Sequence, residues 1–276
     1  MTAPARVYDS DAVSSPVLNE LGELWQRRGL LGLLVRRDVL LRYKRSLLGV
    51  WWAVLNPMLR LAVIWLVMAA IFRPHLPGVP YVVYLLSGLV VITFFDQAVV
   101  AAGTSIVMSS GILTQLYVPA LAFAASAVIA AGVTLLFSLV PLFVIMLTTG
   151  VGIPWTVLLL PLPVLCLVAL ATGVGLLLAS LAVRFYDAID ISAILLQLMA
   201  FTTPSFYPIE AIPASYRWII ELNPLTQIVM LFRTYAYQGQ LGSWQTVLAC
   251  LVSGAVALVV GVIVFARSWK GAAVRL

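Results

Sequence analysis

The stretch RRDVLLRYKRSLLGVWWAVLNPMLR, residues 36–60, decides the fold of this chain. Five of its first ten residues are Arg or Lys, and the run then becomes apolar enough to enter a membrane. The pair Asn56-Pro57 and the charged Arg60 still lie inside the apolar part. We therefore expect a basic collar on one membrane surface that continues directly into a membrane-spanning helix with polar positions.

The composition of the whole chain agrees with a membrane protein. Its 276 residues are 63% hydrophobic and only 9% charged, with a mean hydropathy of +1.10, which excludes an ordinary soluble domain. A spanning helix needs about 20 mostly apolar residues. Six segments meet this requirement, and the sequence predicts an all-α integral membrane protein with spans at residues 50–72, 81–101, 120–147, 155–183, 191–207 and 244–266.

The remaining sequence predicts one membrane domain with a short tail. Residues 1–19 are polar and contain proline, so we expect a disordered cytosolic tail and not a signal peptide. Residues 20–276 form a single transmembrane domain. Within it, leucines recur every three or four positions among the charges of residues 20–48, which predicts an amphipathic interface helix. Gly29 and Gly32 leave open whether this is one helix or two.

The distribution of basic residues predicts the orientation. Residues 20–48 contain seven Arg and Lys against three acidic residues, and basic flanks remain in the cytosol. Six spans then place the C-terminus in the cytosol too, in agreement with the basic residues after the last span. The opposite face receives only Arg73, Arg217 and Arg233.

Two ionisable side chains fall inside predicted spans. Arg60 lies roughly half-way along the first span, where a charge costs about 2.5–3.5 kcal/mol at the centre of an isolated helix. Asp96 lies in the second span, beside the polar Thr93 and Gln97. Either Arg60 bonds a carbonyl or Asp96, or it lines a path for an anionic substrate, and the two roles are compatible.

A loop between the second and third spans, residues 105–118, carries no charge. Gly111 and Pro119 bound a short apolar helix that we expect at residues 112–117. Docking on a cytosolic partner chain would explain its apolar side chains. The alternative is that it lies flat among lipid headgroups.

The segment from residue 202 to residue 237 contains four prolines and is too polar and broken for another crossing. We expect a re-entrant helical hairpin over residues 208–237, in which Asn223 caps the second helix and Pro224 occupies its first turn. Irregular backbone at membrane depth is tolerated only where it is buried in protein or faces water. The hairpin is therefore predicted to line or plug the exit of a path.

Other residue types point away from catalysis. Cys166 and Cys250 lie inside predicted spans and are expected to be packing residues, and His75 stands alone in a loop, so no metal site and no catalytic residue are predicted. Most aromatic residues fit interfacial belts. Aromatic rings around a polar path would also suit a carbohydrate, whose apolar face stacks on them.

Three motifs together resemble a known family: residues 36–60, TTPSFYP at 202–208, and LNPLTQIVMLFR at 222–233. In this order they resemble the membrane subunits of polysaccharide-exporting ABC transporters, the O-antigen and teichoic acid export permeases. The resemblance implies a homodimeric, multi-pass permease of the bacterial inner membrane. It also implies two copies of a separate cytosolic nucleotide-binding ATPase, which bind ATP and Mg. In agreement with this, the chain has no GxxxxGK[ST] motif and is expected to bind no cofactor.

The resemblance also implies roles for particular residues. The substrate would be a polyprenyl-pyrophosphate-linked polysaccharide, of O-antigen, teichoic acid or cell-wall galactan type, that moves from the cytosol to the outer face. Its pyrophosphate would enter at Arg42, Tyr43, Lys44 and Arg45. Residues 105–118 would be the coupling-helix loop, with ATPase contacts at Ile112, Leu113, Leu116 and Tyr117, although the family usually carries basic residues here. The predicted channel residues are Trp51, Asn56, Arg60, Tyr84, Phe94, Asp96, Phe206, Tyr207, Tyr216, Trp218, Asn223 and Tyr235.

Two other functional classes are weighed against this one. An ion-coupled secondary transporter typically has inverted repeats and several intramembrane acids. A membrane-embedded glycan-lipid enzyme would need convergent carboxylates, histidines or metal ligands. Asp96 is the one acid inside the predicted spans, which favours the ATP-driven exporter.

Overall fold

The computed structural model describes residues 22, 28–44, 46–71, 79–109 and 119–272, and all regular structure in these ranges is helical. The described helices are α2 (Arg28–Tyr43), α3 (Trp52–Ile71), α4 (Tyr81–Met108), α6 (Ala120–Thr148), α7 (Pro161–Ala182), α8 (Asp187–Thr202), α9 (Arg217–Leu222), α10 (Pro224–Arg233) and α11 (Trp244–Ala272). Short 3-10 turns η1 to η4 lie at Gly49–Trp51, Trp155–Leu159, Ile209–Ala211 and Ala214–Tyr216, and a π-helical turn, η5, lies at Thr234–Gln238. The predicted all-α class is confirmed.

Five segments of the described chain are long and apolar enough to cross a membrane. They correspond to five of the six predicted spans and lie at Gly49–Met68, Tyr81–Met108, Ala120–Thr148, Trp155–Ala182 and Trp244–Ser268. The helices α4 and α11 continue beyond the predicted ends at residues 101 and 266.

The predicted span at residues 191–207 differs from the structure. The corresponding helix, α8, has 16 residues, which makes it about 24 Å long at 1.5 Å per residue and shorter than a bilayer core of about 30 Å. It ends at Thr202 because Thr203 precedes Pro204 and adopts an extended conformation, with ψ at 131°. The structure therefore does not confirm a sixth span.

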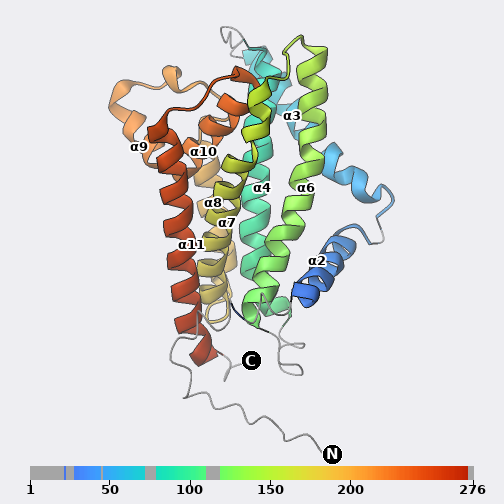
Figure 1. Ribbon diagram of the computed structural model, residues 1–276, viewed down its shortest axis with the longest axis vertical. Helices are drawn as coiled ribbons and strands as arrows, with labels where there is room; N and C mark the ends of the chain where they lie inside the picture. The colour runs from blue at the N-terminus through green and yellow to red at the C-terminus, as the bar shows by residue number, and fades with distance from the viewer. Residues whose placement is uncertain (1–21, 23–27, 45, 72–78, 110–118, 273–276) are drawn as a thin grey trace, which may run out of the picture.

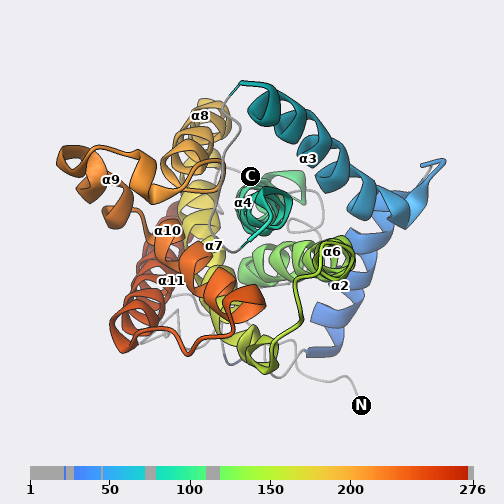
Figure 2. The same cartoon turned by 90° about the horizontal axis from the view of Figure 1, so that it is seen from above.

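The helix α4 forms the centre of the bundle. Figure 2 looks down its axis and shows the other long helices arranged around it. In its most apolar stretch 78% of the residues are buried, against 17% for the stretch that contains α3. Most of the surface of α3 is therefore open, whereas α4 can contact the segments on every side.

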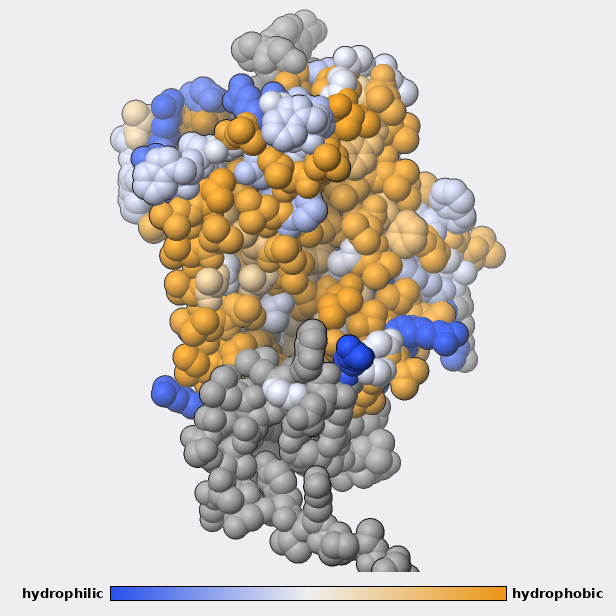
Figure 3. Space-filling model, in the orientation of Figure 1, coloured by the Kyte–Doolittle hydropathy of each residue, from blue (hydrophilic) through white to orange (hydrophobic). Residues whose placement is uncertain are grey.

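The two ends of the bundle differ in their connections. At one end, the collar end, α2 begins and α11 ends (Figure 1). At the other, the hairpin end, α4 and α11 begin, and α9 and α10 lie toward the same end. Figure 3 shows an apolar belt between these ends and a group of hydrophilic residues at the hairpin end. This arrangement fits the predicted orientation, which stays a prediction.

The collar helix α2 is one continuous helix through Gly29 and Gly32. It packs along α6, where Leu34 lies in a small cluster with Ala122 and Phe123. Its last residue, Tyr43, has its hydroxyl 3.3 Å from the Thr134 hydroxyl, which lies near the middle of α6. The helix thus rises along α6 toward the interior of the bundle.

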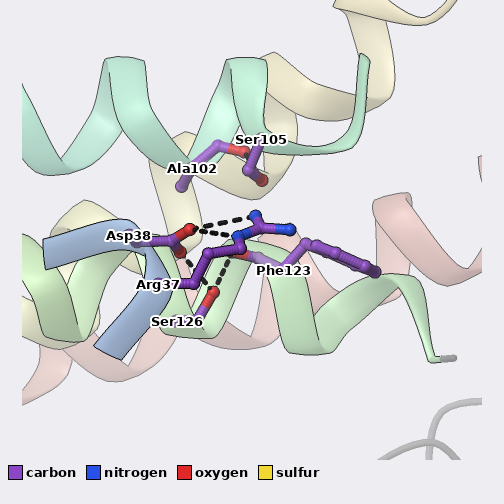
Figure 4. A network of polar contacts seen from close by, with 6 residues as sticks. All are labelled: Arg37, Asp38, Ala102, Ser105, Phe123 and Ser126. Atoms are coloured by element: carbon purple, nitrogen blue, oxygen red, sulfur yellow. Dashed lines mark hydrogen bonds and ion pairs between the residues drawn. The ribbon is translucent and has the colours of Figure 1, made fainter. Parts of the chain in front are cut away.

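A polar network fixes the middle of α2 to α6 (Figure 4). Arg37 Nη2 lies 2.9 Å from Asp38 Oδ1, and Ser126 Oγ donates a hydrogen bond to Asp38 Oδ2 at 2.8 Å. The Arg37 guanidinium also lies over the Phe123 ring, 5.6 Å from its centroid. Asp38 therefore neutralises one collar charge where α2 meets the bundle.

Small residues allow close packing around α7. A Cβ atom on Gly173 would overlap the backbone of Ala257 on α11, and one on Gly175 would lie 2.6 Å from the Ala102 side chain on α4. These glycines are needed because two helix backbones approach each other closely, as is common in membrane bundles.

We expect Gly173→Leu to lower the unfolding temperature of the purified chain, because overpacking costs at least about 1–3 kcal/mol. Gly132→Ala on α6 is the matched control, since a Cβ there meets nothing within 4 Å. The control should unfold at the wild-type temperature or above. Equal unfolding temperatures for the two variants would contradict the close packing of α7 on α11.

Candidate functional site

The backbone is non-helical between α8 and the turn η3, and its carbonyl groups are bonded by side chains. Tyr81 Oη donates to the Phe206 carbonyl at 2.7 Å. Tyr84 Oη lies 2.8 Å from the carbonyl oxygens of both Pro204 and Tyr207, and its single proton serves one at a time. Such bonds are required because an unpaired carbonyl inside a membrane costs several kcal/mol.

Arg233, at the end of α10, completes this set of bonds. Its Nη1 donates to the Pro204 carbonyl at 2.7 Å, and its Nη2 lies 3.4 Å from the Ser205 carbonyl. With Arg233 on Pro204, the Tyr84 proton is available to Tyr207. Each of the four consecutive carbonyls from Pro204 to Tyr207 then has its own donor. We call Tyr81, Tyr84, Ser87, Arg233 and the backbone of residues 204–207 the arginine junction.

Neutral groups surround the Arg233 guanidinium and stabilise its charge. The side chain is 4% exposed, and no ion pair to it occurs within the residues that the structure describes. Nε donates to Ser87 Oγ at 3.2 Å and Nη2 to the Tyr84 carbonyl at 3.0 Å, while the guanidinium carbon lies 3.6 Å from the centre of the Tyr84 ring. Carbonyl dipoles and the ring face thus stabilise the cation.

The sequence analysis missed this role of Arg233, which it counted only among the few charges of the far face. A signal was present, because Arg233 interrupts the apolar run IVMLFRTYAY at residues 228–237. An arginine in such a run at membrane depth must find acceptors within the protein. Which acceptors it finds depends on helix α4, more than 140 residues earlier in the chain.

A cavity of about 760 Å³ lies beside the arginine junction, and we call it the hairpin cavity. Its lining comes from α4, the turn η3, the end of α10, η5 and the start of α11, and includes Tyr84, Glu210, Arg233, Gln238, Gln240 and Thr246. The π-helical turn η5 changes the course of the chain after α10 and ends at Gly239, which has φ at +71°. Single π-helical turns occur frequently at functional sites.

The predicted intramembrane pair Arg60 and Asp96 is close but not joined. Arg60 is exposed on α3, and its Nε donates to the Asn56 side-chain oxygen at 3.1 Å. On α4, the Oδ1 atom of Asp96 and the hydroxyl of Thr93 are buried without a hydrogen-bond partner. The Arg60 guanidinium and the Asp96 carboxylate therefore form no hydrogen bond with each other. Both roles proposed for Arg60 remain open.

The predicted pyrophosphate entrance separates into two parts. Arg42 turns toward the bundle, where Nη1 donates to Gln97 Oε1 at 3.1 Å and to Thr134 Oγ1 at 2.9 Å. Lys44 is exposed and lines a shallow cavity of about 480 Å³ together with Arg37 and Tyr43. We call it the collar cavity. Arg45 lies outside the described residues.

Three predicted channel residues are buried in the protein. Phe94 and Tyr235 belong to the main hydrophobic core. Asn223 caps α10 as predicted, since its Oδ1 accepts from the Leu225 amide at 3.0 Å. Its Nδ2 also donates to the Met199 carbonyl and to Thr203 Oγ1, both at 3.1 Å. In this subunit Phe94 and Tyr235 pack in the core, and Asn223 bonds groups of the protein itself.

The other predicted residues lie in varied environments. Phe206 and Tyr207 are half-buried at the arginine junction, where Tyr207 Oη donates to the Phe201 carbonyl at 2.7 Å. Trp51, Tyr216 and Trp218 are exposed. The predicted ATPase contacts at residues 112, 113, 116 and 117 lie outside the described residues. The assignment of the whole set to a substrate path stays a prediction.

Comparison with known proteins identifies relatives of the chain. The family described as "ABC-2 type transporter" matches residues 29–237. The "O-antigen export system permease protein RfbA" of Myxococcus xanthus is 29% identical over 229 residues, which cover 82% of this chain and 87% of that protein. A Klebsiella pneumoniae protein of the same name is 27% identical over 240 residues, or 86% of this chain and 90% of the relative.

We expect Tyr84→Phe to lower the unfolding temperature, because the Tyr207 carbonyl loses its donor while the ring stays over Arg233. A buried unsatisfied carbonyl costs about 1–3 kcal/mol. Tyr216→Phe is the control, since Tyr216 is 60% exposed and the change should have no effect. A Tyr84→Phe chain as stable as wild type would show that its hydroxyl does not support the junction.

Proposed function

The chain belongs to the ABC-2 type transporter family, and on that premise we propose that it exports a polyprenyl-pyrophosphate-linked polysaccharide as the permease subunit of an ATP-driven complex. It is an ABC permease for polysaccharide export, as the names of its relatives indicate. The observation that carries this conclusion is the extent of the match. Residues 29–237 include the collar, α3, α4 and the complete arginine junction.

Family membership also decides among the alternatives considered for the sequence. The relatives are membrane subunits of transporters, so the enzyme alternative is not retained, and an ABC transporter uses ATP rather than an ion gradient. The ATP and Mg would bind to a separate cytosolic ATPase, present in two copies. In this proposal residues 105–118 contact that ATPase, and both chain termini lie in the cytosol of a bacterium with the spans in its inner membrane.

An exposed charge on α3 and an unsatisfied buried oxygen on α4 support a path between two copies of the chain. Arg60 is exposed and Asp96 has a buried oxygen without a partner, although polar groups at membrane depth are costly unless they face protein or water. Within the part of the chain that the structure describes, most of the α3 surface is not covered by another helix. A homodimer would enclose this face and give Arg60 and Asp96 a water-filled path.

The collar cavity supports entry of an anionic headgroup. Lys44 is exposed, whereas Asp38 already neutralises Arg37 and the bundle already engages Arg42. A free ammonium group at the edge of the membrane attracts phosphate oxygens. We therefore propose that Lys44 binds the pyrophosphate of the lipid-linked precursor. The precursor would be of O-antigen, teichoic acid or cell-wall galactan type.

Depletion of the chain in its native host tests the proposed function directly. We expect a lipid-linked glycan to accumulate on the cytosolic side and the surface polysaccharide to disappear, with recovery upon expression of the wild-type chain. Mass spectrometry of the accumulated lipid would identify the glycan. Unchanged surface polysaccharide after depletion would contradict the proposal.

Charge reversal tests the role of the collar cavity. We expect Lys44→Glu to reduce the export rate severalfold, because phosphate then meets a repelling carboxylate, while the chain still copurifies with its ATPase. Arg267→Glu is the matched control, since Arg267 is exposed near the collar end of α11. Export should be unaffected in the control. Equal losses in the two variants would indicate a general effect of surface charge.

A further inference from the structure

We propose that the hairpin cavity binds one or two neutral sugar units of the exported glycan, a site distinct from the path along α3. The inference rests on the proposed function, because the expected ligand is a sugar unit of the exported polysaccharide. The cavity volume of about 760 Å³ lies within the range of roughly 300–1,000 Å³ that is typical of small-molecule sites.

The first support is the chemistry of the free groups in the lining. The side chains of Gln238 and Gln240 are exposed to the cavity, and no hydrogen bond to another described residue engages either amide. An amide offers both donors and acceptors. A sugar hydroxyl also does both, so a pair of free amides matches neighbouring hydroxyl groups better than it matches an apolar or a purely anionic ligand.

The second support is a buried donor in the cavity lining. Arg233 has five N–H groups, and the arginine junction uses four of them, one on Nε, one on Nη1 and two on Nη2. One N–H of Nη1 remains for a ligand oxygen. Because the other four bonds hold the guanidinium in place, this donor is oriented before any ligand arrives, which reduces the entropy cost of binding.

The third support is the charge balance. Arg233 is buried, and the exposed Glu210 carries the opposite charge in the same lining without an ion pair between them. An anionic sugar would gain from Arg233 and lose from Glu210. A neutral polyhydroxylated ring is not repelled by Glu210. It can also pack its apolar face on the Ile209 and Leu241 side chains, which line the cavity.

The position of the cavity separates it from the proposed membrane path. Its walls come from the first turns of α4, η3, α10, η5 and the start of α11, whereas Figure 2 places α3 on the other side of α4. In the orientation proposed above, the cavity lies at the outer end of the protein. A sugar held there would belong to glycan that has already passed the membrane, so the site would favour outward movement.

Saturation-transfer NMR on the full-length chain in nanodiscs tests the site. The probes are D-galactose, D-mannose and L-rhamnose as neutral sugars, and D-glucuronate as the anionic counterpart. We expect at least one neutral sugar to receive saturation and to bind more tightly than glucuronate. No signal from any neutral sugar would overturn the proposal, and tighter binding of glucuronate would overturn the neutral assignment.

Two variants locate the signal. Thr246→Trp fills the cavity from α11 and should abolish binding, whereas Thr148→Trp, exposed at the hairpin end of α6 and absent from the lining, should leave it intact. The double variant Gln238→Ala with Gln240→Ala removes only exposed amides, so it should fold normally and bind about tenfold more weakly. Wild-type binding in this double variant would place the sugar elsewhere.

The result can be separated from that of the depletion experiment. If depletion stops export but the NMR experiment detects no bound sugar, the cavity site is refuted and the permease function is supported. If the cavity variants abolish sugar binding but depletion leaves export intact, the proposed function is refuted. The bound sugar would then not be part of an exported glycan.

Discussion

The buried guanidinium of Arg233 is the constraint on which the hairpin end of this protein depends. Two costly features are placed together there: a cation without an acidic partner among the described residues, and a run of non-helical backbone between Pro204 and Tyr207. Each would be unfavourable alone in a membrane. Together they satisfy each other, because four consecutive carbonyls need donors and the arginine and two tyrosines supply them.

The central helix α4 connects this junction to the rest of the molecule. Its first turns carry Tyr81, Tyr84 and Ser87, which hold the hairpin end. Further along, Asp96 has a buried oxygen without a hydrogen-bond partner, and Gln97 accepts from Arg42 of the collar. The central helix α4 therefore joins the arginine junction to the collar helix α2.

The basic residues of the chain divide by environment into different functions. Arg37 and Arg42 fasten the collar helix to the bundle, Arg233 holds the hairpin end, and the exposed Lys44 lines the collar cavity. Charge counting treats these four residues alike, although only an exposed and unpaired cation is available to a substrate. Burial and partners decide which positive charges serve structure and which serve transport.

The sequence by itself determined the helical class, the bounds of four of the five apolar segments within a few residues, and the cap at Asn223. These features depend on local properties: the length of an apolar run, or a side chain two residues from the amide that it caps. Only the tertiary structure decided that Arg42 turns inward and that Arg233 is buried. The partners of Arg233 on α4 lie about 146 positions away in the sequence, and only the packed bundle brings them within hydrogen-bonding distance.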